Sequence, residues 1–336
     1  MQIIGLDIGF GFTKVTDGSR RTLFKSLVGE APDIAFREPL VAADGDAPSL
    51  HLALEDEPYF VGDLAERQSS VRQYTLDQDQ LIAEFSRRLG VAALAQLARD
   101  NEPLHVVTGL PVRYYRRHRD SLARQLTGSH RVSLYGPDGK ETALTVKVEK
   151  VRVVPQPFGS LFGAMLNDIG KVSDTALARE KVGVIDIGFR TADYAVAERT
   201  RYSERASGTS EHGIAQAFEL VAAALQEKSG VAVELYRLYQ GVQDGAIKVR
   251  GRNYDLSGIR ERTFERLARA VAGEVNRLWD QDWDIDTILL TGGGGSVLAP
   301  HLAPLVAGEV RAVENEDARF NNVDGYWRYG VHLWER

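Results

Sequence analysis

One tetrapeptide, Asp-Ile-Gly-Phe, occurs twice in the chain, at residues 7–10 and at residues 186–189. Each copy ends an apolar run that is typical of a buried strand, residues 3–8 in the first half and 182–187 in the second. A glycine directly after a strand allows a tight turn whose backbone N–H groups can face an anion, because no Cβ stands in the way. The sequence therefore predicts two strand–turn–strand units of the same kind, one in each half.

The length of the chain, 336 residues, is more than a single hydrophobic core usually supports, so two domains are expected. Strand-like apolar runs alternate with segments of helical periodicity in both halves, which favours an α/β architecture. Helices are predicted over residues 79–99, 160–169, 214–226 and 261–281, a hairpin over 131–154, and an exposed loop over 31–47. We assign residues 1–155 and 319–336 to the first domain and residues 156–318 to the second.

Charge and composition exclude several classes of protein. With 47 acidic and 41 basic residues the net charge is −6, so no global field attracts nucleic acid or anionic lipid. The absence of cysteine excludes a disulfide scaffold, an iron–sulfur cluster, a thiolate zinc site and a cysteine nucleophile. The seven histidines show no ligand spacing, so no zinc site is predicted. We find neither a long apolar span nor a signal peptide, and expect a cytoplasmic protein without membrane insertion.

The aspartates of the two tetrads, Asp7 and Asp186, point to magnesium. A carboxylate repels phosphate but holds Mg²⁺, usually through water, and Mg²⁺ neutralises phosphates. Two such hairpins could hold the phosphates of a nucleotide from opposite sides. The alternative is an ordinary hairpin in which Asp and Gly only form the turn, and the occurrence of a matched pair favours the phosphate interpretation.

Four consecutive glycines, at residues 292–295, follow the last strand predicted in the second half, residues 285–291. A strand, a glycine-rich turn and a helix together let a flat ring or a sugar lie against bare backbone. The run lacks the third glycine of Gly-x-Gly-x-x-Gly, and the chain has no Gly-x-x-x-x-Gly-Lys-Ser/Thr segment. The sequence therefore predicts neither a dinucleotide fingerprint nor a P-loop NTPase.

Together these three segments resemble the motifs of the actin-like ATPases, a superfamily that also includes sugar kinases and the large heat-shock chaperones. Residues 7–14 and 186–193 resemble its two phosphate motifs, and residues 290–295 its adenosine motif. The prokaryotic plasmid-segregation actins (ParM-like) and related archaeal actin-like proteins are similar in shorter segments as well, at residues 61–65, 108–112, 154–159 and 321–330. The resemblance implies two actin-like (RNase H-like) domains, with an interdomain nucleotide cleft that holds ATP or ADP and Mg²⁺.

Carried over to this chain, the resemblance implies a set of catalytic residues. Asp7 and Asp186 would organise hydrated Mg²⁺. Gln156 would orient the attacking water, since an amide is a poor general base but can position water and stabilise charge. Because Gln156 lies between two prolines, it could instead be a turn residue.

The resemblance also implies the nucleotide-binding residues. They are Gly9, Phe10, Gly11, Thr13 and Lys14 in the first hairpin, Gly188, Phe189, Arg190 and Thr191 in the second, and Gly213, Glu219, Gly292, Gly293, Gly294 and Gly295 around the adenosine. Two of these assignments have alternatives. Glu219 could be a solvated helix charge, and Arg190, where the family often has a small residue, either contacts phosphate or lies on the rim.

The function that the resemblance implies is ATP hydrolysis coupled to head-to-tail polymerisation, used in DNA segregation or intracellular positioning through a DNA-bound adaptor. The alternatives are a small-molecule kinase of the same fold and a non-polymerising ATP-dependent regulator or membrane-tethering adaptor. A kinase usually needs an Asp general base, and Gln156 and the compact chain argue against it. We interpret the basic run at residues 113–119 as a solvated helix start and expect no direct nucleic-acid binding. The aromatic C-terminus is expected to dock on the first domain.

Overall fold

The computed structural model describes residues 1–32, 50–73, 82–136, 138–313 and 315–335. Most of the loop predicted over residues 31–47 and the start of the helix predicted over 79–99 lie outside the described residues. Contacts divide the chain into two units. Unit 1 comprises Met1–Leu110, Tyr114–Ser173 and Asn322–Arg336, and unit 2 comprises Pro111–Arg113 and Asp174–Asn321.

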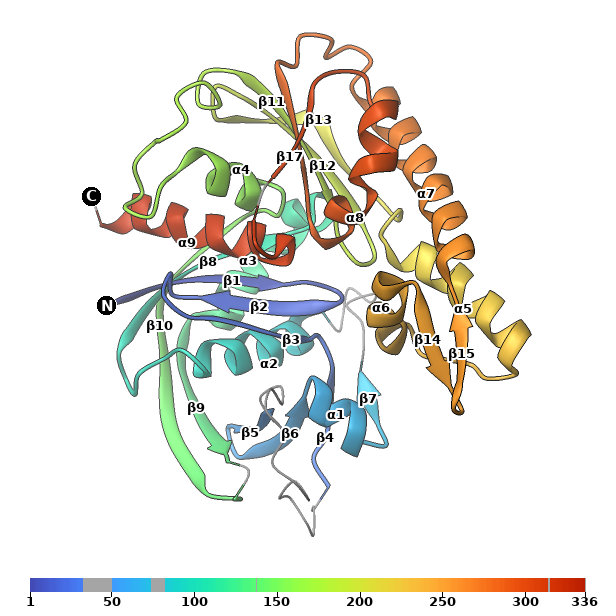
Figure 1. Cartoon of the computed structure of the whole chain (residues 1–336). Coiled ribbons are helices and arrows are strands. Elements are labelled where there is room, and N and C mark those ends of the chain that lie inside the picture. The colour runs from blue at the N-terminus through green and yellow to red at the C-terminus, as the bar shows by residue number, and fades with distance from the viewer. Residues whose placement is uncertain (33–49, 74–81, 137, 314, 336) are drawn as a thin grey trace. The chain divides into compact units, whose positions relative to one another are not determined.

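Unit 1 is built on a mixed sheet that, in the described residues, has ten strands in the order β3-β2-β1-β8-β10-β9-β5-β6-β4-β7 (Figure 1). Neighbours β1, β8 and β10 are parallel and the other pairs are antiparallel. The strands are β1 (Gln2–Ile8), β2 (Phe12–Thr16), β3 (Arg21–Lys25), β4 (Val28–Glu30), β5 (Leu50–Leu54), β6 (Glu57–Val61), β7 (Arg72–Gln73), β8 (Pro103–Leu110), β9 (Gly128–Tyr135) and β10 (Glu141–Pro155). Every residue of β1 after Gln2 is buried, as expected for a parallel strand covered on both faces.

The helices of unit 1 are α1 (Asp63–Gln68), α2 (Ile82–Ala95), most of α3 (Val112–Leu126), α4 (Phe158–Met165) and α9 (Asn321–Trp334). Helix α2 buries Leu89 and Leu94 in the core of this unit. Helix α9 packs on β1, since a Cβ on Gly5 would overlap the backbone of Val323. Its Tyr326 is fully buried, so the aromatic C-terminus docks on the unit that contains the N-terminal strand.

The segment of residues 156–173 has its contacts in unit 1, whereas the sequence analysis assigns it to the second domain. Both the backbone N–H and the hydroxyl of Ser160 donate to Oδ1 of Asn322, at 3.0 and 2.6 Å. Helix α9 approaches so closely that a Cβ on Gly325 would stand 1.7 Å from the carbonyl oxygen of Gly159. Helix α4 therefore joins unit 1 because it supports α9, a contact that spacing along the sequence does not reveal.

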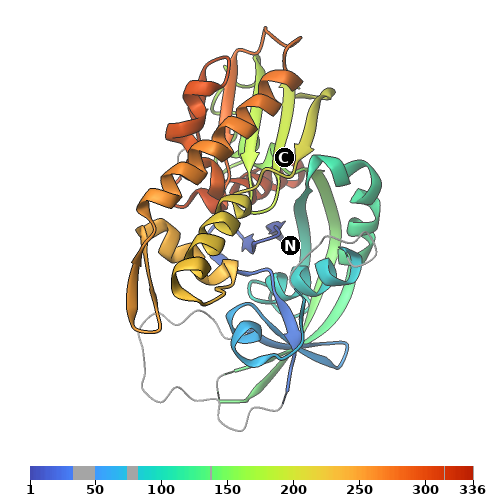
Figure 2. The same ribbon diagram turned by 90° about the vertical axis from the view of Figure 1, so that its right-hand side faces the viewer.

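Unit 2 is built on a smaller sheet that, in the described residues, has the order β13-β12-β11-β16-β17. Its strands are β11 (Lys181–Ile187), β12 (Ala192–Glu198), β13 (Arg201–Ser210), β16 (Thr287–Thr291) and β17 (Val310–Ala312), and a separate hairpin consists of β14 (Ala246–Val249) and β15 (Arg252–Asp255). The helices are α5 (Ala215–Ser229), α6 (Leu235–Asp244), α7 (Ser257–Leu278) and α8 (Gly293–Leu302), with short 3₁₀ turns at Ala303–Leu305 and Ala318–Phe320. Figure 2 shows α7, in orange, running beside this sheet.

Some elements of unit 2 follow from the sequence and others do not. The helices predicted over residues 214–226 and 261–281 correspond to α5 and α7, whose apolar faces form the core with the sheet. Strand β13 is mostly polar, so it carries no clear hydrophobic period. Helix α6 repeats Leu235, Leu238 and Val242 at helical spacing, but its ten residues are a short segment to assign from sequence. In the part of the chain that the structure describes, no helix is both long and apolar enough to cross a membrane.

Candidate functional site

The first tetrad forms a hairpin between β1 and β2 in unit 1. The backbone N–H of Gly9 donates to the carbonyl oxygen of Phe12 at 3.1 Å, and a Cβ on Gly9 would stand 2.9 Å from that oxygen. The register places Asp7 opposite Lys14, and Nζ of Lys14 lies 2.7 Å from Oδ2 of Asp7. The hairpin therefore presents a buried carboxylate and a lysine side by side.

Gln156 joins this pair from another part of the sequence. It directly follows β10, and its Nε2 donates to Oδ1 of Asp7 at 3.2 Å. Its backbone is held on both sides, because its N–H donates to the carbonyl of Leu110 at 2.8 Å and its carbonyl accepts from the Tyr326 hydroxyl at 3.0 Å. The structure thus brings together Asp7, Lys14 and Gln156, three residues that the sequence analysis selects.

Other residues of the first hairpin point elsewhere. The Thr13 side chain is fully buried on the opposite face of β2, 2.9 Å from the Ser26 hydroxyl, so it does not stand beside Lys14. Phe10 belongs to the core of the unit. Ser26, which the sequence analysis does not select, donates through its hydroxyl to the carbonyl of Gly9 at 2.5 Å and through its N–H to that of Gly11 at 2.9 Å. Ser26 therefore keeps the turn in shape, and only its position after a strand could have drawn attention to it.

The second tetrad forms the corresponding hairpin between β11 and β12 in unit 2. The N–H of Gly188 donates to the carbonyl oxygen of Thr191 at 2.9 Å, and the Asp186 carboxylate is buried. The carbonyl of Arg190 accepts from the N–H of Gly213 at 3.0 Å, just before α5. A Cβ on Gly213 would stand 2.2 Å from the carbonyl carbon of Arg190. A glycine at residue 213 therefore allows the start of α5 to lie close to the hairpin. The Arg190 side chain is exposed.

The buried carboxylate of Asp193 stabilises this hairpin through hydrogen bonds. Asp193 accepts hydrogen bonds from the Thr191 hydroxyl at 3.1 Å, the Thr209 hydroxyl at 2.5 Å and the backbone N–H of Val112 at 2.8 Å. Burial raises the pKa of Asp193 to about 6, although these three hydrogen bonds act in the opposite direction. The hydroxyl of Thr191 is thus bound to Asp193, a residue within the second phosphate motif for which the sequence predicts no role.

The glycine run places bare backbone against Asp186. Gly292 has φ +84°, and a Cβ there would stand 2.4 Å from Oδ1 of Asp186 and from the carbonyl oxygen of Ile187. A Cβ on Gly294 would stand 2.8 Å from the Ile187 side chain, whereas one on Gly295 would make only ordinary contacts. The turn therefore requires glycine at residue 292 for both conformation and space.

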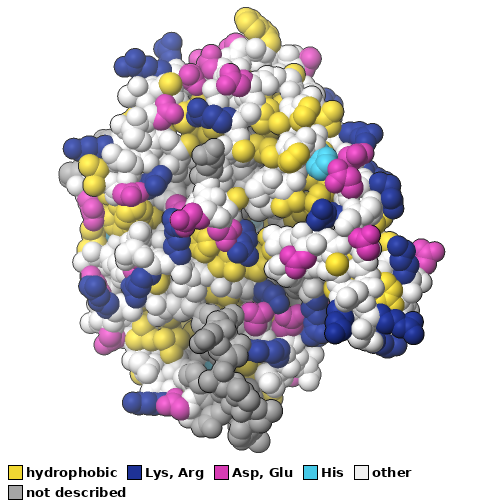
Figure 3. All heavy atoms as spheres, viewed as in Figure 1, with side chains coloured by type: hydrophobic (Ala, Val, Ile, Leu, Met, Phe, Trp, Pro, Cys, Tyr) yellow, Lys and Arg dark blue, Asp and Glu magenta, His cyan; other side chains and the backbone are white. Residues whose placement is uncertain are grey.

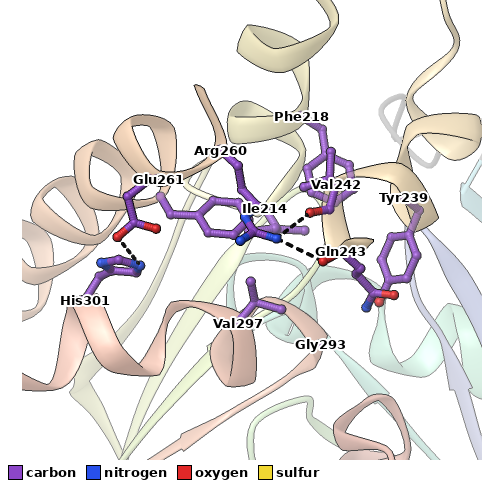
Figure 4. A pocket seen from close by; sticks show the side chains of 11 residues that line it. Ile214, Phe218, Tyr239, Val242, Gln243, Arg260, Glu261, Gly293, Val297 and His301 are labelled. Atoms are coloured by element: carbon purple, nitrogen blue, oxygen red, sulfur yellow. Dashed lines mark hydrogen bonds and ion pairs between the residues drawn. The ribbon is translucent and has the colours of Figure 1, made fainter. Parts of the chain in front are cut away.

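A pocket of about 330 Å³ opens from this turn within unit 2 (Figure 4). Gly293 and Val297 of α8 form one wall, and Phe218 of α5 and Tyr239 of α6 contribute rings. Phe189, at the tip of the second hairpin, packs edge-on to Phe218 with the ring centroids 6.3 Å apart. The remaining lining residues are Ile214, Val242, Gln243, Arg260, Glu261, Phe264 and His301. A mostly apolar cavity with a few polar groups is typical of a small-molecule site.

The polar groups of the pocket differ from those expected. Glu219 is exposed on α5 and does not line the pocket, whereas its neighbour Phe218 does. Gln243 supplies a side-chain amide, and Glu261 lies 3.7 Å from His301. Arg260 donates to the carbonyl oxygens of Val242 and Gln243, at 3.2 and 2.9 Å, and so closes the end of α6 (Figure 4). These residues carry no motif, and only the packing of four helices brings them together.

Each hairpin, taken by itself, suits Mg²⁺ only as a hydrated ion. Within the described residues, no three His, Cys, Asp or Glu side chains gather to hold a metal directly. Each hairpin offers a single buried carboxylate, and carboxylate oxygen is a hard donor that suits Mg²⁺. Mg²⁺ readily keeps several waters and can bind a protein through a single carboxylate, so one such group is a suitable donor.

Family models match both halves of the chain. Residues 5–159 match the N-terminal domain of the actin-like proteins, and residues 184–304 match the C-terminal domain of the archaeal actin homologue MreB-like proteins. The chain belongs to the actin-like protein superfamily. No curated protein matches its sequence.

Solved structures of actin-like proteins share the fold over the whole chain. A ParM filament from Clostridium botulinum is 23% identical with a TM-score of 0.81, and the match covers 98% of each chain. The archaeal actin homologue Ta0583 in complex with ADP is 18% identical with a TM-score of 0.78, over 97% of this chain and 98% of that one. Bacillus thuringiensis ParM with ADP is 14% identical with a TM-score of 0.74, over 100% and 99%. These likenesses establish an actin-like fold with two α/β domains.

Proposed function

We propose that this actin-like protein binds and hydrolyses ATP and that nucleotide turnover controls its head-to-tail polymerisation. The observation that carries the proposal is the continuity of one surface in unit 2. Gly293 lines the pocket, and the preceding residue, Gly292, lies against the Asp186 carboxylate. A ligand with a flat apolar ring at one end and phosphates at the other suits a surface that runs from an apolar pocket to a glycine turn.

In this proposal the purine and ribose occupy the pocket. The rings of Phe218 and Tyr239 and the bare backbone of Gly293 contact the base or sugar, and Gln243 offers a hydrogen-bonding amide. The turns that begin at Gly9 and Gly188 supply phosphate-binding N–H groups, as the glycine-containing turns after β1 and β11 suggest. ADP in the Ta0583 and B. thuringiensis ParM structures supports the choice of nucleotide.

Hydrolysis would depend on residues that position water and hold charge. Gln156 orients the attacking water through its side-chain amide, and Asp7 holds that amide in place. Lys14, paired with Asp7, is the nearby cation that can stabilise the negative charge that develops on the phosphate during hydrolysis. Mg²⁺, held through water by Asp7 and Asp186, would neutralise the phosphates and polarise them.

Polymerisation is proposed from the fold and its relatives. A ParM filament is among the structures that share this fold. In this proposal ATP favours the assembling form and hydrolysis weakens the contact, and the filament acts in DNA segregation or intracellular positioning through a DNA-bound adaptor. The protein would work in the cytoplasm.

The test is sedimentation and negative-stain microscopy in Mg-ATP, Mg-ADP and without nucleotide, with phosphate release followed in parallel. Filaments that form in ATP and decay as phosphate appears would support the proposal. Asp186→Ala should abolish turnover, and unchanged turnover in that variant would overturn the site assignment. ATP consumption that requires a small acceptor, without filaments, would indicate a kinase instead.

A further inference from the structure

Trp283 is the most exposed large apolar side chain among the described residues, with 88% of its surface accessible. It lies between α7 and β16 in unit 2. Burial of an indole removes a large apolar area from water, and tryptophan is enriched among the residues that dominate protein–protein contacts. An indole left in solvent therefore marks a candidate docking point.

The backbone of the loop that carries Trp283 is firmly held. The preceding residue, Asp282, is buried and accepts from Arg205 at 2.7 Å and from Lys181 at 2.9 Å. The N–H of Asp282 donates to the carbonyl of Trp279, and its own carbonyl accepts from Ile285 at 3.1 Å. Little conformational entropy remains to be lost when a partner covers such a loop.

The charge around Trp283 is locally negative. Asp280 and Asp284 flank it and are exposed; Asp284 is paired with Lys181, and the described residues give Asp280 no partner. Lys181 and Arg205 pair with Asp282 and Asp284, so the negative charge left on the Trp283 loop is that of Asp280. A partner surface that complements the Trp283 loop would therefore carry cationic side chains, which can also stack on the indole.

The β14–β15 hairpin carries cationic side chains of this kind. Lys248, Arg250 and Arg252 are exposed on it, and among the described residues none of the three side chains has a hydrogen-bond or ion-pair partner. Figure 3 shows Lys and Arg side chains gathered in this region of unit 2. Arginine guanidinium groups stack on aromatic faces and pair with carboxylates, which suits an indole between aspartates.

Helix α7 separates the two surfaces. It begins two residues after β15 ends and finishes five residues before Trp283, and its 22 residues span about 33 Å. The hairpin and the loop therefore lie at opposite ends of the helix and cannot meet within one chain. Two complementary surfaces at opposite ends of a subunit produce a heterologous contact, which extends into a filament when it does not close.

We propose that two copies of this chain join end to end through these surfaces, with Trp283 of one copy packed against Arg250 and Arg252 of the next. The inference rests on the polymerisation in the proposed function and names the contact that would produce it. The aspartates beside Trp283 pair with the same arginines and set the orientation of the two copies.

The natural absence of cysteine makes a direct test possible. Asp280→Cys and Arg252→Cys variants of the full chain are mixed in Mg-ATP and treated with a short bismaleimide. A heterologous contact should give cross-linked dimers in the mixture and few in either variant alone. Filaments without cross-linking in the mixture, or equal cross-linking of one variant with itself, would overturn the proposed contact.

Trp283→Ala should raise the concentration needed for assembly at least about tenfold, as for a residue that anchors an interface. The matched control is Ile169→Ala, which removes another exposed apolar side chain, 65% accessible, from unit 1. Asp280→Arg and Arg250→Asp should each impair assembly, and mixing the two variants should restore it. Full assembly of Trp283→Ala would refute this contact alone. A natural chain that binds nucleotide but stays monomeric would refute polymerisation and the contact together.

Discussion

The side-chain amide of Gln156 donates a hydrogen bond to the carboxylate of Asp7 at 3.2 Å, across 149 positions of the sequence. Asp7 is the residue before the end of β1, and Gln156 directly follows β10 of the same sheet. Because β1, β8 and β10 are parallel neighbours, their carboxyl ends meet at one edge, and ligands in α/β proteins bind at such edges. Two residues that are remote in the chain thus form one hydrogen-bonded pair at that edge.

Gln156→Ala should lower the rate of ATP hydrolysis by about a hundredfold and leave nucleotide affinity nearly unchanged. The amide is proposed to act on the attacking water and not on the bound ground state, and loss of a single positioned donor has effects of that size. Single-turnover phosphate release measures the rate, and equilibrium titration with a fluorescent nucleotide measures the affinity. A rate equal to that of the natural chain would exclude Gln156 from the reaction.

Gly292→Ala should destabilise unit 2 by at least about 2 kcal/mol and prevent nucleotide binding, because the new Cβ would need a positive φ and would collide with Asp186. Gly273→Ala is the matched control. It lies within α7 with nothing within 4 Å of its added Cβ, so it should raise the free energy of unfolding by about 0.5–1 kcal/mol. Urea denaturation compares the two variants. Equal stability of both would show that residue 292 is not constrained as described.

Gln243→Ala should weaken nucleotide binding by about two- to tenfold, the usual effect of removing one hydrogen bond. Glu219→Ala should leave binding unchanged, because Glu219 is exposed and lies outside the pocket lining. Isothermal titration with ADP gives both affinities. The reverse order of effects would return the contact with the ribose or the base to Glu219, as the family resemblance implies.

Asp193 should make the stability of the chain depend on pH. Its pKa is raised from 3.8 to about 6 in the folded state, so between these values the folded chain binds more protons than the unfolded chain. The resulting stabilisation is complete below pH 3.8 and is lost as the pH rises past about 6, a change of about 3 kcal/mol. The Asp193→Asn variant should lack this pH-dependent part of the free energy of unfolding.

The measurement is urea unfolding of the natural chain and of Asp193→Asn at pH 4 and pH 7. The difference between the two proteins isolates Asp193 from the other groups that titrate in this range. Parallel pH profiles for both proteins would show that Asp193 keeps its ordinary pKa.

The strand–turn–strand units could be predicted from sequence because their signals are local. An apolar run followed by glycine specifies a buried strand and a tight turn within a dozen residues, and both hairpins form where expected. The long helix α7 shows its apolar period over six turns. Lys14 faces Asp7 because the hairpin register follows from the length of the turn.

The base pocket could not be predicted in the same way. Its residues come from four helices, and each helix has several polar positions that satisfy the same period. Glu219 and Gln243 are equally plausible in sequence, but the packing of α5 turns Glu219 outward while the end of α6 carries Gln243 into the cavity. The face to which the Thr13 side chain points is likewise not given by the motif, because it depends on the alternation of side chains along β2.

The sequence by itself therefore determined that this chain has two Asp-Ile-Gly-Phe turns at strand ends and a glycine run after a strand, and that it belongs to the actin-like superfamily. These features are local, because short-range backbone geometry demands particular residues at particular spacings. Only the tertiary structure decided that residues 156–173 support α9 in unit 1, that Asp193 is buried behind the second hairpin, and which side chains line the pocket. These depend on how helices and strands pack, and packing selects among many positions that are equivalent in local pattern.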